Sequence, residues 1–180
     1  MLNALLFVMG NLILIGFMGA GKSTVGKLCA AHLGYAFVDS DAVIEAHAGC
    51  SVAQLFAARG ERAFRRLERQ ALAALSARPG VVIATGGGAV LDADNVALLR
   101  ARGRVVLLLA SPEAVLARVG EAATRPLLAG ALDPRSRIAA LLAERDAAYR
   151  RAAHHCVDTL QRTPEQVAED VVTWYRKESE

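Results

Sequence analysis

The stretch Gly16-Phe17-Met18-Gly19-Ala20-Gly21-Lys22-Ser23 matches the phosphate-binding loop pattern G-x-x-x-x-G-K-[ST] at every defined position. Glycines at these positions let backbone N–H groups curl around a phosphate chain without Cβ clashes. The lysine of the pattern reaches the β- and γ-phosphates, and the serine hydroxyl binds Mg²⁺. We therefore predict a nucleotide-binding site formed by Gly19, Ala20, Gly21, Lys22, Ser23 and Thr24.

The residues on either side of this loop support the match. The apolar run at 12–15 precedes it and is typical of a buried strand. After the loop, Val25, Leu28 and Ala31 recur at helical spacing until Gly34 ends the pattern. A strand, a glycine loop and a helix in this order bring the positive end of the helix dipole to a bound anion. A chance glycine-rich turn would not need these flanking elements.

The length and hydropathy limit the classes of protein to which the chain can belong. Its 180 residues suit one compact domain, so we expect a single domain over residues 1–180. The mean hydropathy is +0.31, yet no stretch reaches the roughly 18 uninterrupted apolar residues of a membrane span. The segment 2–15 comes closest, but polar residues interrupt it and it lacks a basic start, so we predict neither membrane insertion nor a signal peptide. Residues 1–8 could be an extension ahead of a start at Met9.

The charge and the cysteines bear on partners and location. The chain has 21 basic and 18 acidic residues, and no basic stretch is interleaved with aromatic residues, so we expect no nucleic-acid partner. Most of the basic residues are arginines, which favour bidentate pairing with phosphate and carboxylate and suit a small anionic substrate. The three cysteines are odd in number and widely spaced, which favours reduced thiols in the cytoplasm. We expect a monomer.

Apolar strands alternate with helices along the chain. This alternation predicts an α/β fold of three layers, in which helices cover both faces of a parallel sheet. Ligands in such folds bind beyond the carboxyl ends of the strands. Strands are expected at 11–15, 35–38, 81–84, 104–109 and 155–157. Helices are expected at 22–33, 51–58, 61–76, 93–101, 112–119, 134–152 and 164–177.

Asp39 and Asp41 follow the second expected strand. Carboxylates at positions i and i+2 of an extended segment lie on the same side, so both would face the phosphate site. One could serve Mg²⁺, directly or through water. The other could bind a substrate hydroxyl and accept its proton, as phosphoryl transfer to an alcohol requires. Alternatively, the pair forms an Asx turn or a cap on the next helix. The neighbouring phosphate loop favours the functional interpretation.

Two further features could bind an acceptor molecule. Arg65 and Glu68 are three residues apart on an expected helix, and pairing would hold the guanidinium fork ready for a substrate carboxylate. A solvated charged face is the alternative, and the spacing alone does not decide. Three glycines at 86–88 end the third expected strand, where the backbone must approach another group closely. A flexible linker is the alternative, but the apolar residues on both sides favour an ordered turn.

Two more arginine positions stand out later in the chain. Residues 118–132 have glycines near both ends and little helical pattern, which suggests a mobile flap or, alternatively, an ordinary surface loop. An arginine on a closing flap, such as Arg118 or Arg125, can neutralise charge on a phosphoryl group in transfer. Arg145 falls within the apolar stripe of the helix expected at 134–152. A charge there needs an internal acidic partner or must face a cleft.

Taken in order, these pieces closely resemble the shikimate kinase family. The resemblance runs from about residue 11 to residue 172. Its specific parts are the phosphate loop, V-D-S-D at 38–41, L-F-x-x-x-G-E-x-x-F-R-x-x-E at 55–68, the triple glycine, T-R-P-L-L at 124–128 and R-x-x-x-Y at 145–149. Their combination is far more discriminating than any one of them.

The resemblance implies a P-loop kinase fold with a five-stranded parallel sheet in the order 2-3-1-4-5. It implies transfer of the γ-phosphate of ATP to the 3-hydroxyl of shikimate, in the route to chorismate and the aromatic amino acids. By the same resemblance, a substrate-binding region covers about 39–70 and a lid covers about 118–132.

The resemblance also implies roles for individual residues. Asp41 would hold the acceptor hydroxyl and act as the base, and Lys22 and Arg125 would act on the phosphates. Ser23 and Asp39 would serve Mg²⁺. The implied shikimate-binding residues are Asp41, Arg65, Gly86, Gly87, Gly88 and Arg145, and the implied adenine-flanking residues are Arg118 and Arg162.

Two other functions share parts of this pattern. Another small-molecule kinase, such as one for gluconate, would carry the same phosphate loop, but Arg65, Arg145 and the triple glycine favour shikimate. A non-catalytic nucleotide-binding regulatory module would be favoured by apolar residues in place of Asp41, Arg65 or Arg145, and none is replaced.

Overall fold

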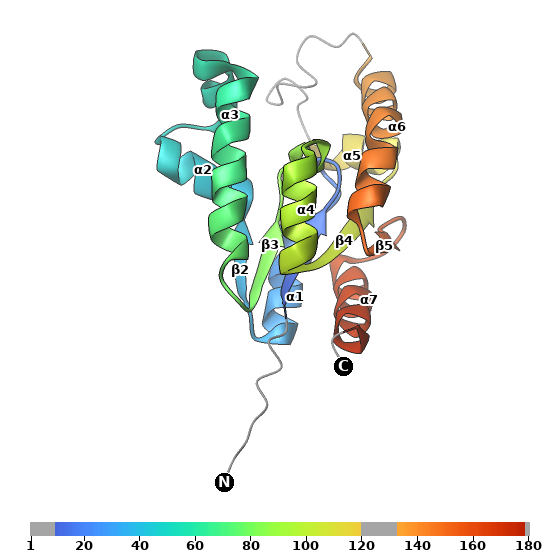
Figure 1. The fold of residues 1–180 in the computed structure, drawn as a ribbon. Helices are drawn as coiled ribbons and strands as arrows, with labels where there is room; N and C mark the ends of the chain where they lie inside the picture. Colours follow the sequence, from blue (N-terminus) through green and yellow to red (C-terminus); the bar gives the residue numbers. More distant parts are fainter. Residues whose placement is uncertain (1–9, 120–132, 179–180) are drawn as a thin grey trace.

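A parallel sheet forms the centre of the computed structural model, which describes residues 10–119 and 133–178 (Figure 1). Its five strands lie in the order β2-β3-β1-β4-β5, and each neighbouring pair is parallel. This confirms the predicted α/β class and strand order. β1 lies in the middle, so the loop that follows it opens at the centre of the sheet. The strands are β1 (Asn11–Ile15), β2 (Ala36–Asp39), β3 (Val81–Ala84), β4 (Gly103–Leu109) and β5 (His155–Asp158).

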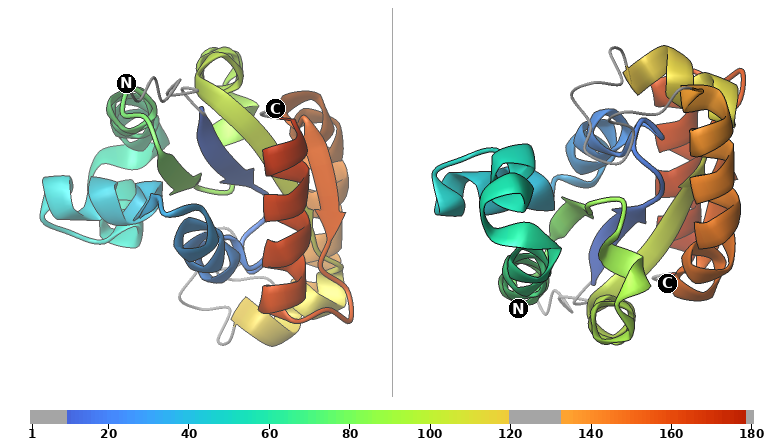
Figure 2. Two further views of the ribbon diagram at one scale, coloured as in Figure 1. Left: turned by 90° about the horizontal axis from the view of Figure 1, so that it is seen from below. Right: turned by 90° about the horizontal axis from the view of Figure 1, so that it is seen from above.

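Helices cover both faces of the sheet, as the views along the strands show (Figure 2). The side chains of β1 alternate between two cores and are fully buried. Leu12 and Leu14 pack in the core that includes α1 and α7, whereas Ile13 and Ile15 pack in the core with α3, α4 and α6. These helices are α1 (Lys22–Leu33), α7 (Pro164–Lys177), α3 (Val52–Ser76), α4 (Ala93–Arg102) and α6 (Pro134–Ala152).

Helix α2 (Ser40–Ala48) is the main element that the sequence analysis missed. The segment after β2 was expected to stay extended through residue 41, but β2 ends at Asp39. The Asp39 side chain accepts a hydrogen bond from the backbone N–H of Asp41 at 3.0 Å and so caps the new helix. Gly49, with a φ of 69°, ends it. An Asp cap followed by a glycine nine residues after the first helical position was the signal that could have revealed this helix.

Helix α3 contains both helices expected at 51–58 and 61–76. Gly60, with a φ of 73° and a ψ of 170°, interrupts the helical conformation between them. The Ser51 side chain and Gln54 form a capping box at the start. Where α2 packs on α3, Ile44, Leu55 and Phe64 make a small core of their own. This core fixes α2 and α3 beside the carboxyl ends of the strands.

The remaining described elements are η1 (Ala89–Leu91) and α5 (Pro112–Val119), which follow β3 and β4. Among the described residues, no helix has both the length and the apolar composition needed to cross a membrane.

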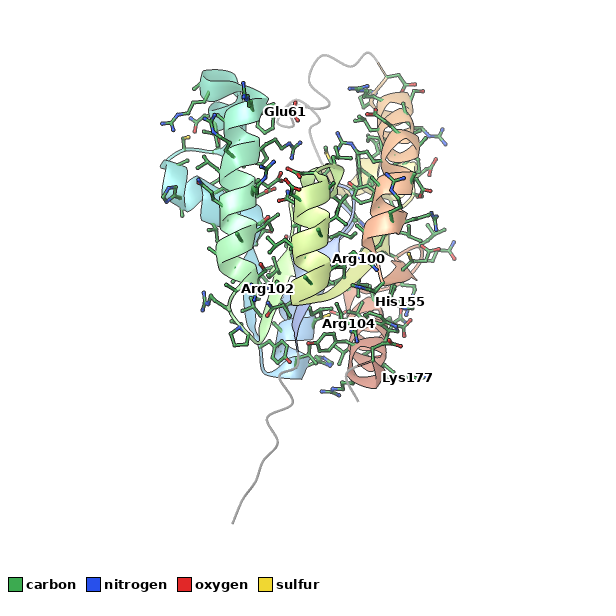
Figure 3. The ribbon with its side chains drawn as sticks, in the orientation of Figure 1. Glu61, Arg100, Arg102, Arg104, His155 and Lys177 are labelled. Atoms are coloured by element: carbon green, nitrogen blue, oxygen red, sulfur yellow. The ribbon has the colours of Figure 1, made fainter. Side chains whose placement is uncertain are left out.

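Several arginines stabilise helix ends on the side of the molecule away from the carboxyl ends of the strands. Arg100 donates to the carbonyls of Ala152 at 3.0 Å and Ala153 at 3.1 Å, where α6 ends. Arg104 donates to the carbonyl of Glu178 at 3.1 Å, just beyond α7. Figure 3 shows both arginines lower in the molecule than Glu61. Part of the arginine content therefore caps helix C-termini, where positive charge is favourable, rather than binding an anionic substrate as the composition suggested.

Candidate functional site

The phosphate loop connects β1 to α1 in a conformation that needs its glycines. Gly16, Gly19 and Gly21 have φ values of 142°, 74° and 95°, a region that residues with a side chain rarely adopt. A Cβ on Gly16 would also lie 2.6 Å from the carbonyl oxygen of Leu108. Gly21 is the N-cap of α1, and no side chain caps that end. The N-terminal N–H groups of α1 are therefore left to an anionic ligand.

Lys22 is bound to its own loop. Its ammonium group donates to the carbonyl of Gly16 at 2.8 Å and to that of Phe17 at 2.9 Å. The Lys22 charge also lies near enough to Asp41 to lower the pKa of that carboxyl. The phosphate loop and the segment after β2 thus form one site, as the parallel sheet requires.

Ser23 and Asp39, the two residues expected to serve Mg²⁺, are in direct contact. The Ser23 hydroxyl donates to Asp39 Oδ2 at 2.6 Å. The other oxygen of Asp39 caps α2, so the carboxylate is held from two sides. A serine hydroxyl and a carboxylate at the start of α1 make a pair of oxygen ligands of the kind that Mg²⁺ prefers.

Asp41 lies in the first turn of α2, not on an extended strand end. The predicted geometry for Asp39 and Asp41 was therefore wrong, because the two carboxylates are not related by the alternation of a strand. The cap that was weighed as an alternative is present, and it coexists with a site. Asp41 Oδ1 is buried and has no hydrogen-bond partner within the described part of the chain. An unpartnered buried carboxylate oxygen is costly, and a substrate hydroxyl would satisfy it.

The pKa of Asp41 is raised to about 6, chiefly because burial disfavours the charged form. The neighbouring carboxylates of Asp39, Glu68 and Glu45 raise the pKa further, and the Lys22 ammonium partly opposes them. A carboxylate with a pKa close to neutral is suited to accept a proton from a substrate, because it is ionised at pH 7 and still basic.

Arg65 and Glu68 form the pair that their spacing allowed. Arg65 Nη1 lies 2.7 Å from Glu68 Oε2, and Glu68 is fully buried. Glu61 supplies a second carboxylate 3.0 Å from Arg65 Nη2 (Glu61 is labelled in Figure 3). Burial raises the pKa of the Glu68 carboxyl, and the adjacent guanidinium opposes that rise. Two acidic partners fix the Arg65 guanidinium in direction, while its side chain stays 24% exposed and open to a ligand.

The triple glycine lies between these groups, and each glycine faces a different one. A Cβ on Gly86 would lie 2.7 Å from Asp41 Oδ1 and 3.0 Å from Glu68 Oε1. A Cβ on Gly88 would lie 2.5 Å from Arg65 Nη2. The glycines thus leave room for the side chains of Asp41, Glu68 and Arg65 to converge. This is an ordered turn and not a flexible linker, because Gly86 N donates to the buried Ser40 hydroxyl at 3.0 Å.

Arg145 on α6 is almost fully buried, with 6% of its surface exposed. None of the ion pairs among the described residues involves it, and its Nε is buried without a hydrogen-bond partner. Its guanidinium carbon instead lies 5.9 Å from the centre of the Phe17 ring in the phosphate loop. The internal acidic partner that was the alternative is not found in the described part of the chain. A buried guanidinium without a carboxylate is poised for an anionic ligand.

The arginines predicted to contact the nucleotide have different surroundings. Arg118 Nη1 lies 3.3 Å from the carbonyl of Gly19 and 3.4 Å from the Thr159 hydroxyl, so it joins the phosphate loop to the loop after β5. Arg162 is paired with Asp170 of α7 at 2.8 Å. Arg125, with most of the predicted lid, lies outside the described residues.

Comparison with known proteins gives a consistent result. The family model for shikimate kinase matches residues 18–176. The chain belongs to the shikimate kinase family. A shikimate kinase of Caldanaerobacter subterraneus subsp. tengcongensis is 46% identical over 169 residues, covering 94% of this chain and 98% of that protein. The solved structure of a shikimate kinase from Acinetobacter baumannii in complex with shikimate has a TM-score of 0.90 at 38% identity, covering 94% of each chain.

Shikimate kinases are enzymes, and this member is an ATP-dependent phosphotransferase that acts on shikimate. The predicted recognition and activity are confirmed. A gluconokinase from Sinorhizobium meliloti has a TM-score of 0.55 at 15% identity, covering 94% of this chain and 93% of that chain, which shows a shared fold alone. The fold therefore does not separate the two activities, and the distinction rests on the family and the residues that face the acceptor.

Replacing Gly88 by alanine in this shikimate kinase is expected to raise the KM for shikimate about tenfold or more, because the new Cβ displaces the Arg65 guanidinium. The fold should persist, since the φ of Gly88 is −105° and the crowded atoms end a flexible side chain. Steady-state kinetics with shikimate as the varied substrate measures the effect.

Gly34→Ala is the matched control for that variant. It replaces a glycine with a φ of 69° and open space around it, so it should lower the melting temperature without changing the KM for shikimate. An unchanged KM in Gly88→Ala would show that Arg65 does not contribute to shikimate binding.

The sequence analysis overlooked three residues of this site. Ser40 holds Gly86, Phe17 lies beside Arg145, and Tyr149 donates to the carbonyl of Gly87 at 2.5 Å. Phe17 stood at a variable position of the phosphate loop, and Ser40 and Tyr149 appeared only within the motifs V-D-S-D and R-x-x-x-Y, without a role of their own. No local signal marks such contacts, because each joins segments far apart in the chain.

Proposed function

We propose that this site transfers the γ-phosphate of ATP to the 3-hydroxyl of shikimate, with Asp41 as the base, in the route to chorismate and the aromatic amino acids. The observation that carries the proposal is the unpartnered Oδ1 of Asp41, which faces Gly86 close to the charge of Lys22. A hydroxyl bound there donates its hydrogen to Asp41 while its oxygen faces the end of the phosphate loop. Asp41 accepts the proton as the oxygen attacks phosphorus.

Arg65 and Arg145 bind the carboxylate of shikimate in this proposal. Arg65 is directed by Glu61 and Glu68, and Arg145 is buried over Phe17 with no carboxylate partner among the described residues. Two fixed guanidinium groups and one aspartate suit an acceptor with one carboxylate and three hydroxyls. The backbone of Gly86, Gly87 and Gly88 would line the acceptor pocket beside Asp41 and Arg65. Gluconate also has a carboxylate and hydroxyls, but no observation on this chain favours it.

The nucleotide side of the proposal rests on the phosphate loop. Backbone N–H groups of residues 19–24 and the Lys22 ammonium would bind the phosphates of ATP, and Lys22 would leave its loop carbonyls to do so. Arg118 would lie beside the adenine, since it already contacts Gly19 and Thr159. The adenine role of Arg162 and the phosphate role of Arg125 remain proposals from the family resemblance.

The residues present fit Mg²⁺. Ser23 Oγ and Asp39 Oδ2 are oxygen donors 2.6 Å apart. No group of three or more His, Cys, Asp or Glu residues in the described part of the chain could hold a metal by itself. A site with few protein ligands suits Mg²⁺, which keeps several waters and takes phosphate oxygens as ligands. Mg²⁺ would neutralise charge on the phosphates when bound, and we assign it to Ser23 and Asp39.

A coupled assay of ADP release with Mg²⁺-ATP tests the proposed function. The purified chain is supplied with shikimate, with gluconate or with no acceptor. Release that depends on shikimate alone is the expected result, and ³¹P NMR of the product then identifies the phosphorylated hydroxyl. Turnover with gluconate, or equal turnover without an acceptor, would overturn the acceptor assignment while leaving the nucleotide site intact.

The proposed base makes a pH prediction. Because Asp41 must be ionised to accept a proton and its pKa is about 6, kcat/KM for shikimate should rise with pH through about 6 and level off above it. Initial rates between pH 5 and about 8.5 at saturating Mg²⁺-ATP measure the profile. The dissociation constant for ATP over the same range separates titration of the nucleotide from that of the enzyme. A flat profile would count against Asp41 as the base.

We also propose a single-domain monomer in the cytoplasm. The three cysteines are all free, which suits a reducing compartment. Light scattering after size exclusion should give a mass near 19.0 kDa, and a multiple of that mass would contradict the monomer.

A further inference from the structure

Tyr149 on α6 is a buried residue whose hydroxyl reaches the middle of the triple glycine. It is 4% exposed and lies one helical turn after Arg145. Its hydroxyl donates to the carbonyl of Gly87 at 2.5 Å. Burial raises the pKa of Tyr149 to about 12, with the Arg145 guanidinium partly opposing the rise. The Tyr149 hydroxyl therefore stays protonated, and able to donate, at neutral pH.

Gly87 is wedged between Tyr149 and the phosphate loop. A Cβ on Gly87 would lie 3.4 Å from the backbone nitrogen of Met18, 3.6 Å from the carbonyl oxygen of Gly16 and 3.7 Å from the Tyr149 hydroxyl. Gly87 thus lies next to the phosphate loop and to Tyr149 of α6.

A second hydroxyl anchors the same segment from the opposite side of the site. Ser40, fully buried at the start of α2, accepts a hydrogen bond from Gly86 N at 3.0 Å. The segment 86–88 is therefore bound by two side-chain hydroxyls, those of Ser40 and Tyr149. Gly86 faces Asp41 and Gly88 faces Arg65, so any displacement of the segment changes the space beside both groups.

The Tyr149 ring packs in the core that includes α3, α4 and α6. Tyr149 also lines a cavity of about 410 Å³, together with Phe17, Leu142 and the ends of β4 and β5 among others. A ring beside such a space can shift when its hydrogen bond is removed. The Tyr149 hydroxyl bonds to the Gly87 carbonyl and also interacts with the Arg145 guanidinium, so it joins the glycine segment to α6.

We propose that Tyr149 is a positioning residue for the acceptor site: its hydroxyl, acting through the Gly87 carbonyl, holds the segment 86–88 in register with Asp41, Arg65 and the phosphate loop. Ser40 holds the same segment through Gly86. In this proposal neither hydroxyl contacts the substrate itself. The inference rests on the proposed function of the site, because the segment matters only if it lines the shikimate pocket.

Tyr149→Phe tests the proposal, since it removes one oxygen and keeps the ring. The KM for shikimate, and its dissociation constant measured by calorimetry without nucleotide, should both rise about tenfold, which is the loss expected for one buried hydrogen bond. The KM for ATP should change less than about twofold. Calorimetry measures shikimate binding in the absence of turnover. A weaker dissociation constant therefore shows that Tyr149 positions the binding site, independently of any effect on catalysis.

Tyr175→Phe is the matched control. The Tyr175 hydroxyl also donates to a glycine carbonyl, that of Gly10, from helix α7, and Tyr175 is fully buried. Both variants should lower the melting temperature, but only Tyr149→Phe should weaken shikimate binding. Equal losses of melting temperature with shikimate affinity unchanged in both would overturn the proposal and leave Tyr149 a core residue.

A second variant tests the proposal if Tyr149→Phe does not fold. Ser40→Ala removes the other anchor and should also raise the KM for shikimate; an unchanged KM would show that the position of the segment is not set by these hydroxyls. Turnover by the wild-type chain separates a failure of the proposed function from a failure of the positioning role. A wild type without shikimate-dependent turnover refutes the proposed function, whereas an active wild type with a normal Tyr149→Phe variant refutes only the positioning role.

Discussion

Asp41→Asn is expected to lower kcat for shikimate phosphorylation about a thousandfold, which is within the range that a general base contributes. The amide keeps the size of the side chain but accepts no proton. ATP binding should stay within about twofold of the wild type, because Asp41 lies on α2 and not in the phosphate loop. Steady-state rates with shikimate and calorimetry with ATP measure the two effects.

The same substitution should stabilise the fold at neutral pH. The pKa of Asp41 in the folded chain, about 6, is above its ordinary value of 3.8, so the folded state binds more protons between these values and stability falls as pH rises through that range. Above pH 6 the ionised carboxylate destabilises the fold by at most about 3 kcal/mol. Asparagine removes this cost, and the melting temperature at pH 7.5 should rise by about 3 °C or more.

Asp94→Asn is the control for Asp41→Asn, since its side chain is 82% exposed on α4 and faces no part of the site. It should change neither kcat nor the melting temperature appreciably. Near-normal turnover in Asp41→Asn would refute the base assignment. A fall in its melting temperature at pH 7.5 would instead show that the Asp41 carboxylate stabilises the apoenzyme.

Arg145→Ala is expected to weaken shikimate binding about a hundredfold, the effect of losing two charge-assisted hydrogen bonds to a carboxylate. Stability should fall only modestly, because no described acidic residue loses an ion-pair partner when the guanidinium is removed. Shikimate calorimetry and thermal unfolding measure the two effects side by side.

Arg150→Ala provides the comparison on the same helix. Arg150 is 56% exposed and pairs with Asp146 at 2.8 Å, so its loss removes an equal charge outside the site. Its shikimate affinity should match the wild type. A large loss of melting temperature with unchanged shikimate affinity in Arg145→Ala would indicate that Arg145 serves the core and not the substrate.

The nucleotide half of the site was predictable because its signals are local. The phosphate loop is eight consecutive residues with a strand before it and a helix after it, and Ser23 at the start of α1 lies in contact with Asp39 at the end of β2. Helix α2 was missed because the functional interpretation of Asp39 was preferred to the helix cap that was weighed as its alternative, whereas Asp39 caps α2 and also lies in the site. When one residue both caps a helix and lies in a site, an interpretation that chooses between the two roles is incomplete.

The acceptor half shows where spacing stops being informative. Arg65 and Glu68 had the right separation to pair, but whether they formed a solvated face or a buried pair depended on α2 and on the segment 86–88 packing over them. Arg145 was recognised as needing a partner or a cleft, and only the neighbouring elements could decide between these.

The sequence by itself determined the α/β class, the strand order through its family resemblance, and the position of the phosphate loop, because these follow from periodicity and from residue types at fixed short spacing. Only the tertiary structure decided the surroundings of Asp41, Arg145 and Tyr149. Burial, unpartnered oxygens and a raised pKa arise from contacts between distant segments, such as Ser40 with Gly86, which are 46 residues apart. Such contacts depend on the three-dimensional packing of whole helices and strands, and no local pattern of residues encodes them.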